Sequence, residues 1–89
     1  HRHAWSSGVF GYLVSLSTSL VSASLIEAED GKVFCEFRSK NGFDVSRIAT
    51  EFGGGGHKAA SGCSRIIEIE QFKSEVIARL TELVEAFEG

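Results

Sequence analysis

Residues 20–39, LVSASLIEAEDGKVFCEFRS, form two runs rich in β-branched and aromatic residues on either side of an Asp-Gly pair at 30–31. This dipeptide is favoured in tight hairpin turns because both of its residues can adopt positive φ. In the second run Val33, Cys35 and Phe37 point to one face, and the residues between them point to the other. The stretch therefore predicts a β-hairpin with one buried face.

The segment after the hairpin switches to helical spacing. In DVSRIATEF, residues 44–52, the apolar residues are separated by 3, 4 and 7 positions. Asp44 is a suitable N-cap because its carboxylate can accept from the free amides of the first turn. Gly53 stands where a C′ glycine is expected. These signals predict a short helix that ends at the glycine run.

The remaining segments complete the prediction. CSRIIEIE (63–70) indicates a strand, and GYLVSLST (11–18) fits a strand, with a short helix as the alternative. QFKSEVIARLTELVEAFE (71–88) indicates a helix whose apolar stripe is typical of core packing: Phe72, Val76, Ile77, Leu80, Leu83, Val84 and Phe87. We therefore expect an α/β fold. It should contain a small mixed β-sheet with a hairpin, two or more helices, and a Gly-rich loop between a helix and a strand.

The composition is that of one globular domain. The 89 residues are 43% hydrophobic and 24% charged, and we expect a single domain over 1–89. We expect residues 1–8, HRHAWSSG, to be a frayed or tag-derived start without function. The net charge of −3 argues against non-specific coating of nucleic acid. Residues 31–65, however, hold six basic and three acidic residues, which suits a small anionic ligand.

Cysteine usage and hydropathy bear on the compartment. Cys35 and Cys63 lie 28 positions apart, and no Cys-x-x-Cys spacing is present. We interpret both as reduced thiols that pack as small apolar residues in a cytoplasmic protein. Residues 4–26 carry no charge, but eight of these 23 residues are Ser or Thr. That content is too polar for a spanning helix, so we expect no membrane segment.

Residues 51–62, EFGGGGHKAASG, place four glycines before a histidine and a lysine. A P-loop needs Gly directly before Lys, and a dinucleotide fingerprint follows a strand, so neither motif applies. The remaining hypothesis is a nest of glycine amides around a phosphate, with His57 as a further donor. A helical turn in HKAAS would add its dipole. The alternative is a flexible linker with a surface histidine.

A second candidate cluster, FRSKNG (37–42), ends the hairpin. Arg38 offers a planar fork of five donors that suits phosphate oxygens, and Ser39 adds a hydroxyl. The alternative is a solvated strand end. We expect Lys40 and Lys58 to act as screening charges rather than as specific contacts.

Together these motifs resemble a known family. GGGGHKAASG (53–62) is similar to the Gly-Gly-Gly-Gly-His-x-x-Ala-Ala-Gly signature of the DHH-associated C-terminal domain in DHH-family phosphoesterases. The order of Arg-Ser, Val-x-x-Ile-Ala and glycine run in residues 37–58 resembles the nanoRNase and pAp phosphatase branch. The resemblance covers residues 20–69, and Ser61 stands where a second alanine is usual.

The resemblance implies a substrate-binding lobe that closes over an N-terminal DHH catalytic domain holding two manganese ions. Arg38 and Ser39 would contact the nucleotide. Its phosphate would be held by the residues that match the motif: Gly54, Gly55, Gly56 and His57. The DHH triplet is not among these residues, so we expect no catalytic or metal-binding residue in the chain and manganese only in that other domain. A short oligoribonucleotide or mononucleotide, the DHH domain and, as an open alternative, a second copy of the chain are the expected partners.

Other functions remain as alternatives. A cyclic-dinucleotide phosphodiesterase or a RecJ-type exonuclease uses a related lobe, and the C-terminal domain of alanyl-tRNA synthetase is a similar tRNA-associated module. The acidic remainder of the chain and the lack of stacking aromatics beside the glycine run disfavour binding of a long single strand. A purely structural or dimerising domain would leave the glycines unexplained.

Overall fold

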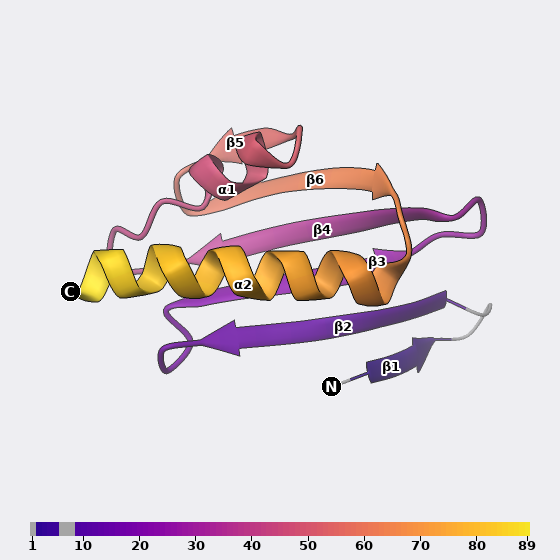
Figure 1. Cartoon of the computed structure of the whole chain (residues 1–89), viewed down its shortest axis with the longest axis horizontal. Coiled ribbons are helices and arrows are strands. Elements are labelled where there is room, and N and C mark those ends of the chain that lie inside the picture. Colours follow the sequence, from indigo (N-terminus) through magenta and orange to yellow (C-terminus); the bar gives the residue numbers. More distant parts are fainter. Residues whose placement is uncertain (1, 6–8) are drawn as a thin grey trace.

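One β-sheet carries the fold, and a long helix crosses one of its faces (Figure 1). The computed structural model describes residues 2–5 and 9–89. Its elements in chain order are β1 (Arg2–Trp5), β2 (Val9–Leu16), β3 (Val21–Glu27), β4 (Lys32–Ser39), α1 (Ser46–Glu51), β5 (Gly55–His57), β6 (Ala60–Ile66) and α2 (Ile69–Glu88).

The strands lie in the order β1-β2-β3-β4-β6-β5, and every pairing among the described residues is antiparallel. The α/β fold with a hairpin and two helices is confirmed. The sheet is antiparallel rather than mixed, because a parallel neighbour needs a long crossover connection. Helix α1 has six residues, too few to cross a sheet face and return the chain in parallel.

The β3–β4 hairpin forms where the sequence predicts it, with a longer turn. Gly31 N donates to Ala28 O at 3.1 Å, and Ala28 N donates to Lys32 O at 2.8 Å. Of the Asp-Gly pair only Gly31 has a positive φ, at 83°. Three residues, 29–31, therefore separate the bonded pair Ala28 and Lys32, instead of the two-residue loop that an Asp-Gly pair favours. The register that results keeps the predicted alternation of β4.

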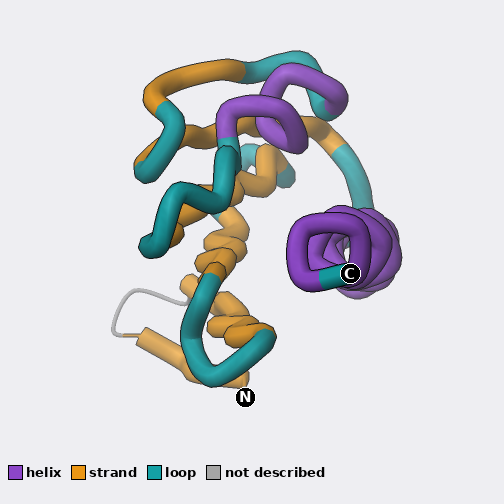
Figure 2. The backbone as a smooth tube through the Cα atoms, turned by 90° about the vertical axis from the view of Figure 1, so that its left-hand side faces the viewer, coloured by secondary structure: helices purple, strands orange, loops and turns teal. Residues whose placement is uncertain are grey.

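The hydrophobic core lies between the sheet and α2, which covers one face only (Figure 2). The alternate residues of β4 that the sequence predicts to share a face are buried together with Phe72 and Val76 of α2. Most of the predicted stripe of α2 is buried. Phe87 stays 48% exposed at the margin, where its ring meets that of Phe43 edge-on at 5.3 Å between centroids.

Helix α1 is short, and its start lies later than predicted. It begins at Ser46, so Asp44 does not occupy the N-cap position. The Asp44 carboxylate nevertheless accepts from the Ser46 hydroxyl at 2.6 Å and from the Ser46 backbone N–H at 2.9 Å. These two hydrogen bonds lower the pKa of Asp44 below its ordinary value. Asp44 therefore still accepts hydrogen bonds from the first residue of the helix, although it lies one position before the N-cap, Val45.

The boundary between the last strand and the last helix lies earlier in the chain than the predicted boundary at residues 70 and 71. The strand predicted over 63–70 is β6, which begins at Ala60 and ends at Ile66. Helix α2 begins before residue 71 because the Glu68 carboxylate accepts from the backbone N–H of Gln71 at 3.1 Å and caps the helix.

The N-terminal segment is more ordered than predicted. Residues 11–18 were expected to form a strand or a short helix, and β2 confirms the strand. Residues 2–5, within the start expected to fray, form β1 and pair with β2. The rest of that expectation, residues 1 and 6–8, lies outside the described residues.

Cys35 and Cys63 are free and buried, as the sequence predicts. They lie directly opposite each other in the β4–β6 pairing. A hydrogen bond between the two thiols, together with burial, raises the pKa of Cys35.

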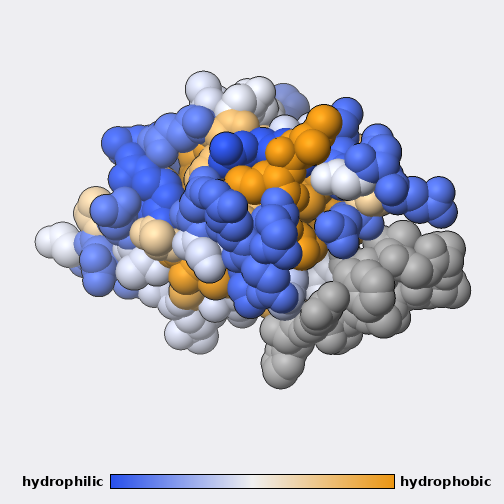
Figure 3. All heavy atoms as spheres, turned by 45° about the vertical axis from the view of Figure 1, so that its right-hand side comes forward, coloured by the Kyte–Doolittle hydropathy of each residue, from blue (hydrophilic) through white to orange (hydrophobic). Residues whose placement is uncertain are grey.

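The surface is mainly hydrophilic on the face drawn in Figure 3, where hydrophobic residues emerge as a patch near the middle. Among the described residues, neither helix combines the length and apolarity that crossing a bilayer requires.

The ion pair between the two helices gives a first test of the fold. Arg79 of α2 donates to both carboxylate oxygens of Glu51 in α1, at 2.7 and 2.9 Å. These bonds lower the pKa of Glu51 from its ordinary 4.5. A carboxyl group with a lowered folded-state pKa stabilises the fold above its ordinary pKa, and this contribution is lost as the pH falls through the lowered value.

We therefore expect Glu51→Gln to lower the free energy of unfolding at neutral pH by up to about 1 kcal/mol, as is usual for a partly exposed pair. Urea unfolding at a series of pH values should show the difference from the unchanged chain shrinking as the pH falls below 4.5. A difference that stays constant with pH would contradict this role for the ion pair.

Candidate functional site

The glycine run does not form the predicted nest. Gly55–His57 is strand β5 at the edge of the sheet, paired antiparallel with β6. The chain reverses at 58–59 and continues directly into β6, so HKAAS forms a hairpin turn and strand rather than a helical turn. The prediction fails because strand pairing uses backbone amides that a nest would direct at an anion.

The first two glycines of the run end helix α1. Gly53 has φ of 92°, and its N–H donates to Thr50 O at 3.0 Å. The N–H of Gly54 donates to Ala49 O at 2.8 Å. This pair of bonds is a Schellman motif, so the predicted C′ role of Gly53 is confirmed.

Two of the glycines allow β5 to approach β6 closely. A Cβ added to Gly54 would lie 2.0 Å from Gly62 O, and one added to Gly56 would lie 2.6 Å from Ser61 Cα. A Cβ on Gly55 would have no atom within 4 Å. The fold itself thus requires glycine at three of the four positions, and Gly55 alone among the four faces open space without a positive φ.

A groove runs over the open face of the sheet, across β4, β6 and β5. The register places Arg38 opposite Ala60, and Ala60 opposite His57. Directly opposite residues of antiparallel strands project to the same face, so both basic side chains flank a small residue of the middle strand. Beside them lies a hollow of about 310 Å³, lined by Glu36, Arg38, Gly55, Gly56, Ala60, Ser61 and Gly62.

The structure therefore brings Arg38, Gly55 and Gly56 to one hollow. His57 continues the Arg38–Ala60 row at the edge of the sheet, outside the lining of that hollow. Gly54 lies farther along the same groove.

The Arg38 guanidinium is open to an anion from solvent. Its side chain is 62% exposed. Its contacts are long, with Nη2 at 3.5 Å from Glu36 Oε1 and Nη1 donating to Phe37 O at 3.4 Å. An exposed ion pair contributes about 0–1 kcal/mol, so a phosphate can replace Glu36 as partner at little cost. The Glu36 carboxylate repels a further negative group at its own side of the hollow.

Ser39 lies at the end of β4 and points away from Arg38, because successive residues of a strand face opposite sides. Its hydroxyl donates to Phe43 O at 2.5 Å and lies 3.3 Å from Lys58 O. The bond to Phe43 O ties the end of β4 to the segment before α1, and the contact with Lys58 O brings it against the β5–β6 turn. The structure does not bring the Ser39 hydroxyl into the row of Arg38 and His57, and its contact with a substrate stays a prediction.

The β5–β6 turn is held from two directions. Lys58 O accepts from Val45 N at 2.8 Å, and Ala59 O accepts from Ser39 N at 3.0 Å. Ser61 is buried and donates from its hydroxyl to Val45 O at 2.8 Å. The serine that stands in place of the usual alanine thus ties β6 to the start of α1. A strand held in this way does not agree with the flexible-linker alternative.

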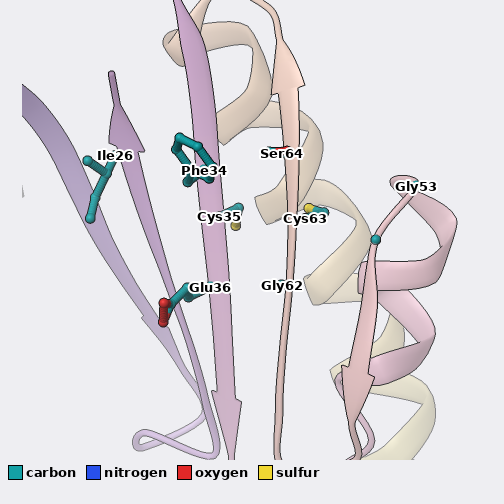
Figure 4. A pocket seen from close by; sticks show the side chains of 9 residues that line it. Ile26, Phe34, Cys35, Glu36, Gly53, Gly62, Cys63 and Ser64 are labelled. Carbon is teal, nitrogen blue, oxygen red and sulfur yellow. The ribbon is translucent and has the colours of Figure 1, made fainter. Parts of the chain in front are cut away.

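The sequence motifs do not indicate a second hollow, of about 570 Å³, on the same open face (Figure 4). It shares Glu36 and Gly62 with the first hollow, so the two form one groove along β4 and β6. The signal that could have revealed it is the run of small residues at 60, 62 and 64. Because alternate residues share a face, these three leave one face of β6 without large side chains. Its lining is Ile26, Phe34, Cys35, Glu36, Gly53, Gly54, Gly62, Cys63 and Ser64.

The groove does not fit a two-metal centre, which needs several carboxylate and imidazole ligands around the metal pair. Glu36 is the one carboxylate among the residues that line the two hollows. Within residues 2–5 and 9–89, no group of three or more His, Cys, Asp or Glu side chains is placed to hold a metal ion.

Comparison with known families agrees with the fold and the glycine run. The family model of the DHHA1 domain matches residues 5–87. The chain therefore belongs to the DHHA1 family, the DHH-associated C-terminal domain of DHH-family phosphoesterases. In such proteins this accessory domain normally accompanies an N-terminal DHH catalytic domain. No curated protein is similar enough to this chain to count as a match.

The glycine contacts predict opposite results for two neighbouring substitutions. Gly54→Ala would press a Cβ against Gly62 O, and we expect it to lower the free energy of unfolding by at least about 1–3 kcal/mol. Gly55→Ala meets open space and should change that free energy by about 0.5 kcal/mol or less. Urea unfolding followed by circular dichroism measures both. Equal losses would show that β5 does not approach β6 as described.

Proposed function

We propose that the chain is the substrate-recognition lobe of a DHH-family phosphoesterase that hydrolyses short oligoribonucleotides or pAp. The row of Arg38, Ala60 and His57 beside Gly55 is the observation that carries this proposal. It places Arg38 on β4 and His57 on β5, on either side of Ala60 on the intervening strand β6. Gly55, which has no side chain, lies next to this row.

The geometry suits a phosphate group. The guanidinium of Arg38 presents parallel N–H donors that match two phosphate oxygens, and a charge-assisted bond of this kind is stronger than a neutral one. His57 donates from the other side of Ala60. Gly55 lets the phosphate or the sugar lie against the strand, because no side chain projects there.

The charge distribution favours a small ligand. Arg38 lines the hollow, and His57 and Lys58 follow at the end of β5 and in the β5–β6 turn, while Glu36 and the net charge of −3 oppose a long polyanion. In this proposal the chain binds and orients the substrate, and the metal ions that hydrolysis requires belong to the accompanying DHH domain.

Substitution of the two basic residues tests the proposal. Arg38→Ala and His57→Ala should each weaken binding of pAp by about 1–3 kcal/mol, the usual effect of removing a charge-assisted hydrogen bond. Arg47→Ala is the matched control, because Arg47 is exposed to a similar extent, 65%, and lies on α1 away from the groove. Isothermal titration at fixed salt measures all three variants.

If Arg47→Ala weakens binding of pAp equally, the loss comes from the lower net positive charge rather than from a lost contact. That result would contradict a specific site. An unchanged affinity in Arg38→Ala and His57→Ala, with the unchanged chain still binding pAp, would place the nucleotide elsewhere on the molecule.

The proposed roles, substrate binding in this chain and hydrolysis in the DHH domain, give a separate prediction. The 89-residue chain with added manganese should form no AMP from pAp and no mononucleotide from a dinucleotide, because its groove offers one carboxylate rather than a set of metal ligands. Chromatography of the products after long incubation measures this. Turnover that persists in highly purified protein and disappears in the His57→Ala variant would refute it.

A further inference from the structure

The second hollow of the groove contains an exposed aromatic ring. Phe34 projects from β4 on the open face and is 45% exposed. The register places Ile26 and Ser64 on either side of it, directly opposite on β3 and β6. In Figure 4, Phe34 and Ile26 stand side by side on neighbouring strands, and Gly53 lies across the hollow from them.

The remaining walls of this hollow leave space for a flat ligand. Gly53, Gly54 and Gly62 line it with backbone rather than side chains. Its volume of about 570 Å³ and its mixture of an apolar wall with a few polar groups are typical of small-molecule sites. An aromatic face, an aliphatic neighbour and a bare backbone together suit a planar, partly polar ring.

We propose that this hollow is a subsite for a nucleobase, which stacks on Phe34 while a phosphate of the same ligand binds at Arg38. The proposal rests on the function proposed above. Phe34 and Arg38 share one face of β4 and are four residues apart, which corresponds to about 13 Å along a strand. The two backbone positions are thus farther apart than a base and a phosphate joined through a single sugar, and the proposal assigns the stacked base to a neighbouring nucleotide.

The polar groups of the subsite favour particular bases. Glu36 lies on the same face between Phe34 and Arg38, and its carboxylate accepts hydrogen bonds from amino groups on base edges. The Nζ of Lys32 lies over the Phe34 ring, 5.8 Å from its centroid, so a stacking base displaces this ammonium or uses the other face of the ring. Adenine, cytosine and guanine carry an exocyclic amino group and uracil carries none, so Glu36 selects against uracil at this position.

The subsite revises one sequence expectation. Stacking aromatics were expected to be absent beside the glycine run, and Phe34 precedes that run by 19 positions. The sheet nevertheless places Phe34 in one hollow with Gly53 and Gly54. An exposed aromatic ring is therefore present beside the glycines, and it comes from another strand.

Two ligands of different length test the proposal on the full 89-residue chain: pAp, and the 5′-phosphorylated dinucleotide pApA. Phe34→Ala should weaken binding of pApA by about tenfold or more, as loss of one stacked base does. It should leave the affinity for pAp unchanged. Phe34→Tyr keeps the ring and should bind pApA like the unchanged chain, while Phe34→Leu keeps apolar area without the ring and should behave like Phe34→Ala.

Leu13→Ala is the control for loss of an exposed apolar side chain, because Leu13 is 49% exposed on the same open face. It should alter neither affinity. Amide spectra of each variant establish that the fold is kept, and titration of the unchanged chain with pApA should shift the amide signals of Phe34 and Ser64, whereas pAp should not.

The outcomes separate this proposal from the function on which it rests. If pAp and pApA bind and Phe34→Ala weakens neither, or both equally, the base subsite is wrong and the phosphate site stands. A Phe34→Leu variant that binds pApA normally would also refute stacking. If the unchanged chain binds neither ligand, both proposals fail.

Discussion

The antiparallel pairing of β4 with β6 is the constraint on which the groove depends. It joins residues 28 positions apart in the chain, with Cys35 opposite Cys63, and buries both cysteines on the face that α2 covers. Because neighbouring residues of a strand alternate, burial of these two fixes which residues face outward. Phe34, Glu36 and Arg38 then stand on the open face along one side of β6.

The same pairing explains the glycine run. After α1 the chain has few residues in which to end a helix, reverse and lie beside β6, and it does so through a Schellman motif followed by a three-residue strand. Ordering four glycines costs more conformational entropy than ordering any other residues. Backbone hydrogen bonds and the close approach of β5 to β6 offset that cost. The run therefore serves mainly to shape the fold, and Gly55 is the one of its four positions that faces open space without a positive φ.

Much of the fold was predictable because its signals are local. The alternation in β4 and the helical spacing in α2 each follow from periodicity within one segment, and Gly53 was recognisable as a helix terminator. Strand β5 was not predictable, because glycine has low β-propensity and the run shows no alternation. The functional candidates Arg38, the glycines and His57 were identifiable as residues, whereas the direction in which Ser39 points follows only from the register of β4.

The sequence by itself determined the family, the order of most elements and the supply of basic residues around the glycine run. The tertiary structure alone decided that Arg38 and His57 flank Ala60, and that Phe34 shares a hollow with Gly53 and Gly54. These neighbours come from strands whose register is set by packing the sheet against α1 and α2, and a shift of one residue would turn every side chain of a strand to the other face. No local pattern encodes that register, since it depends on contacts between segments far apart in the chain.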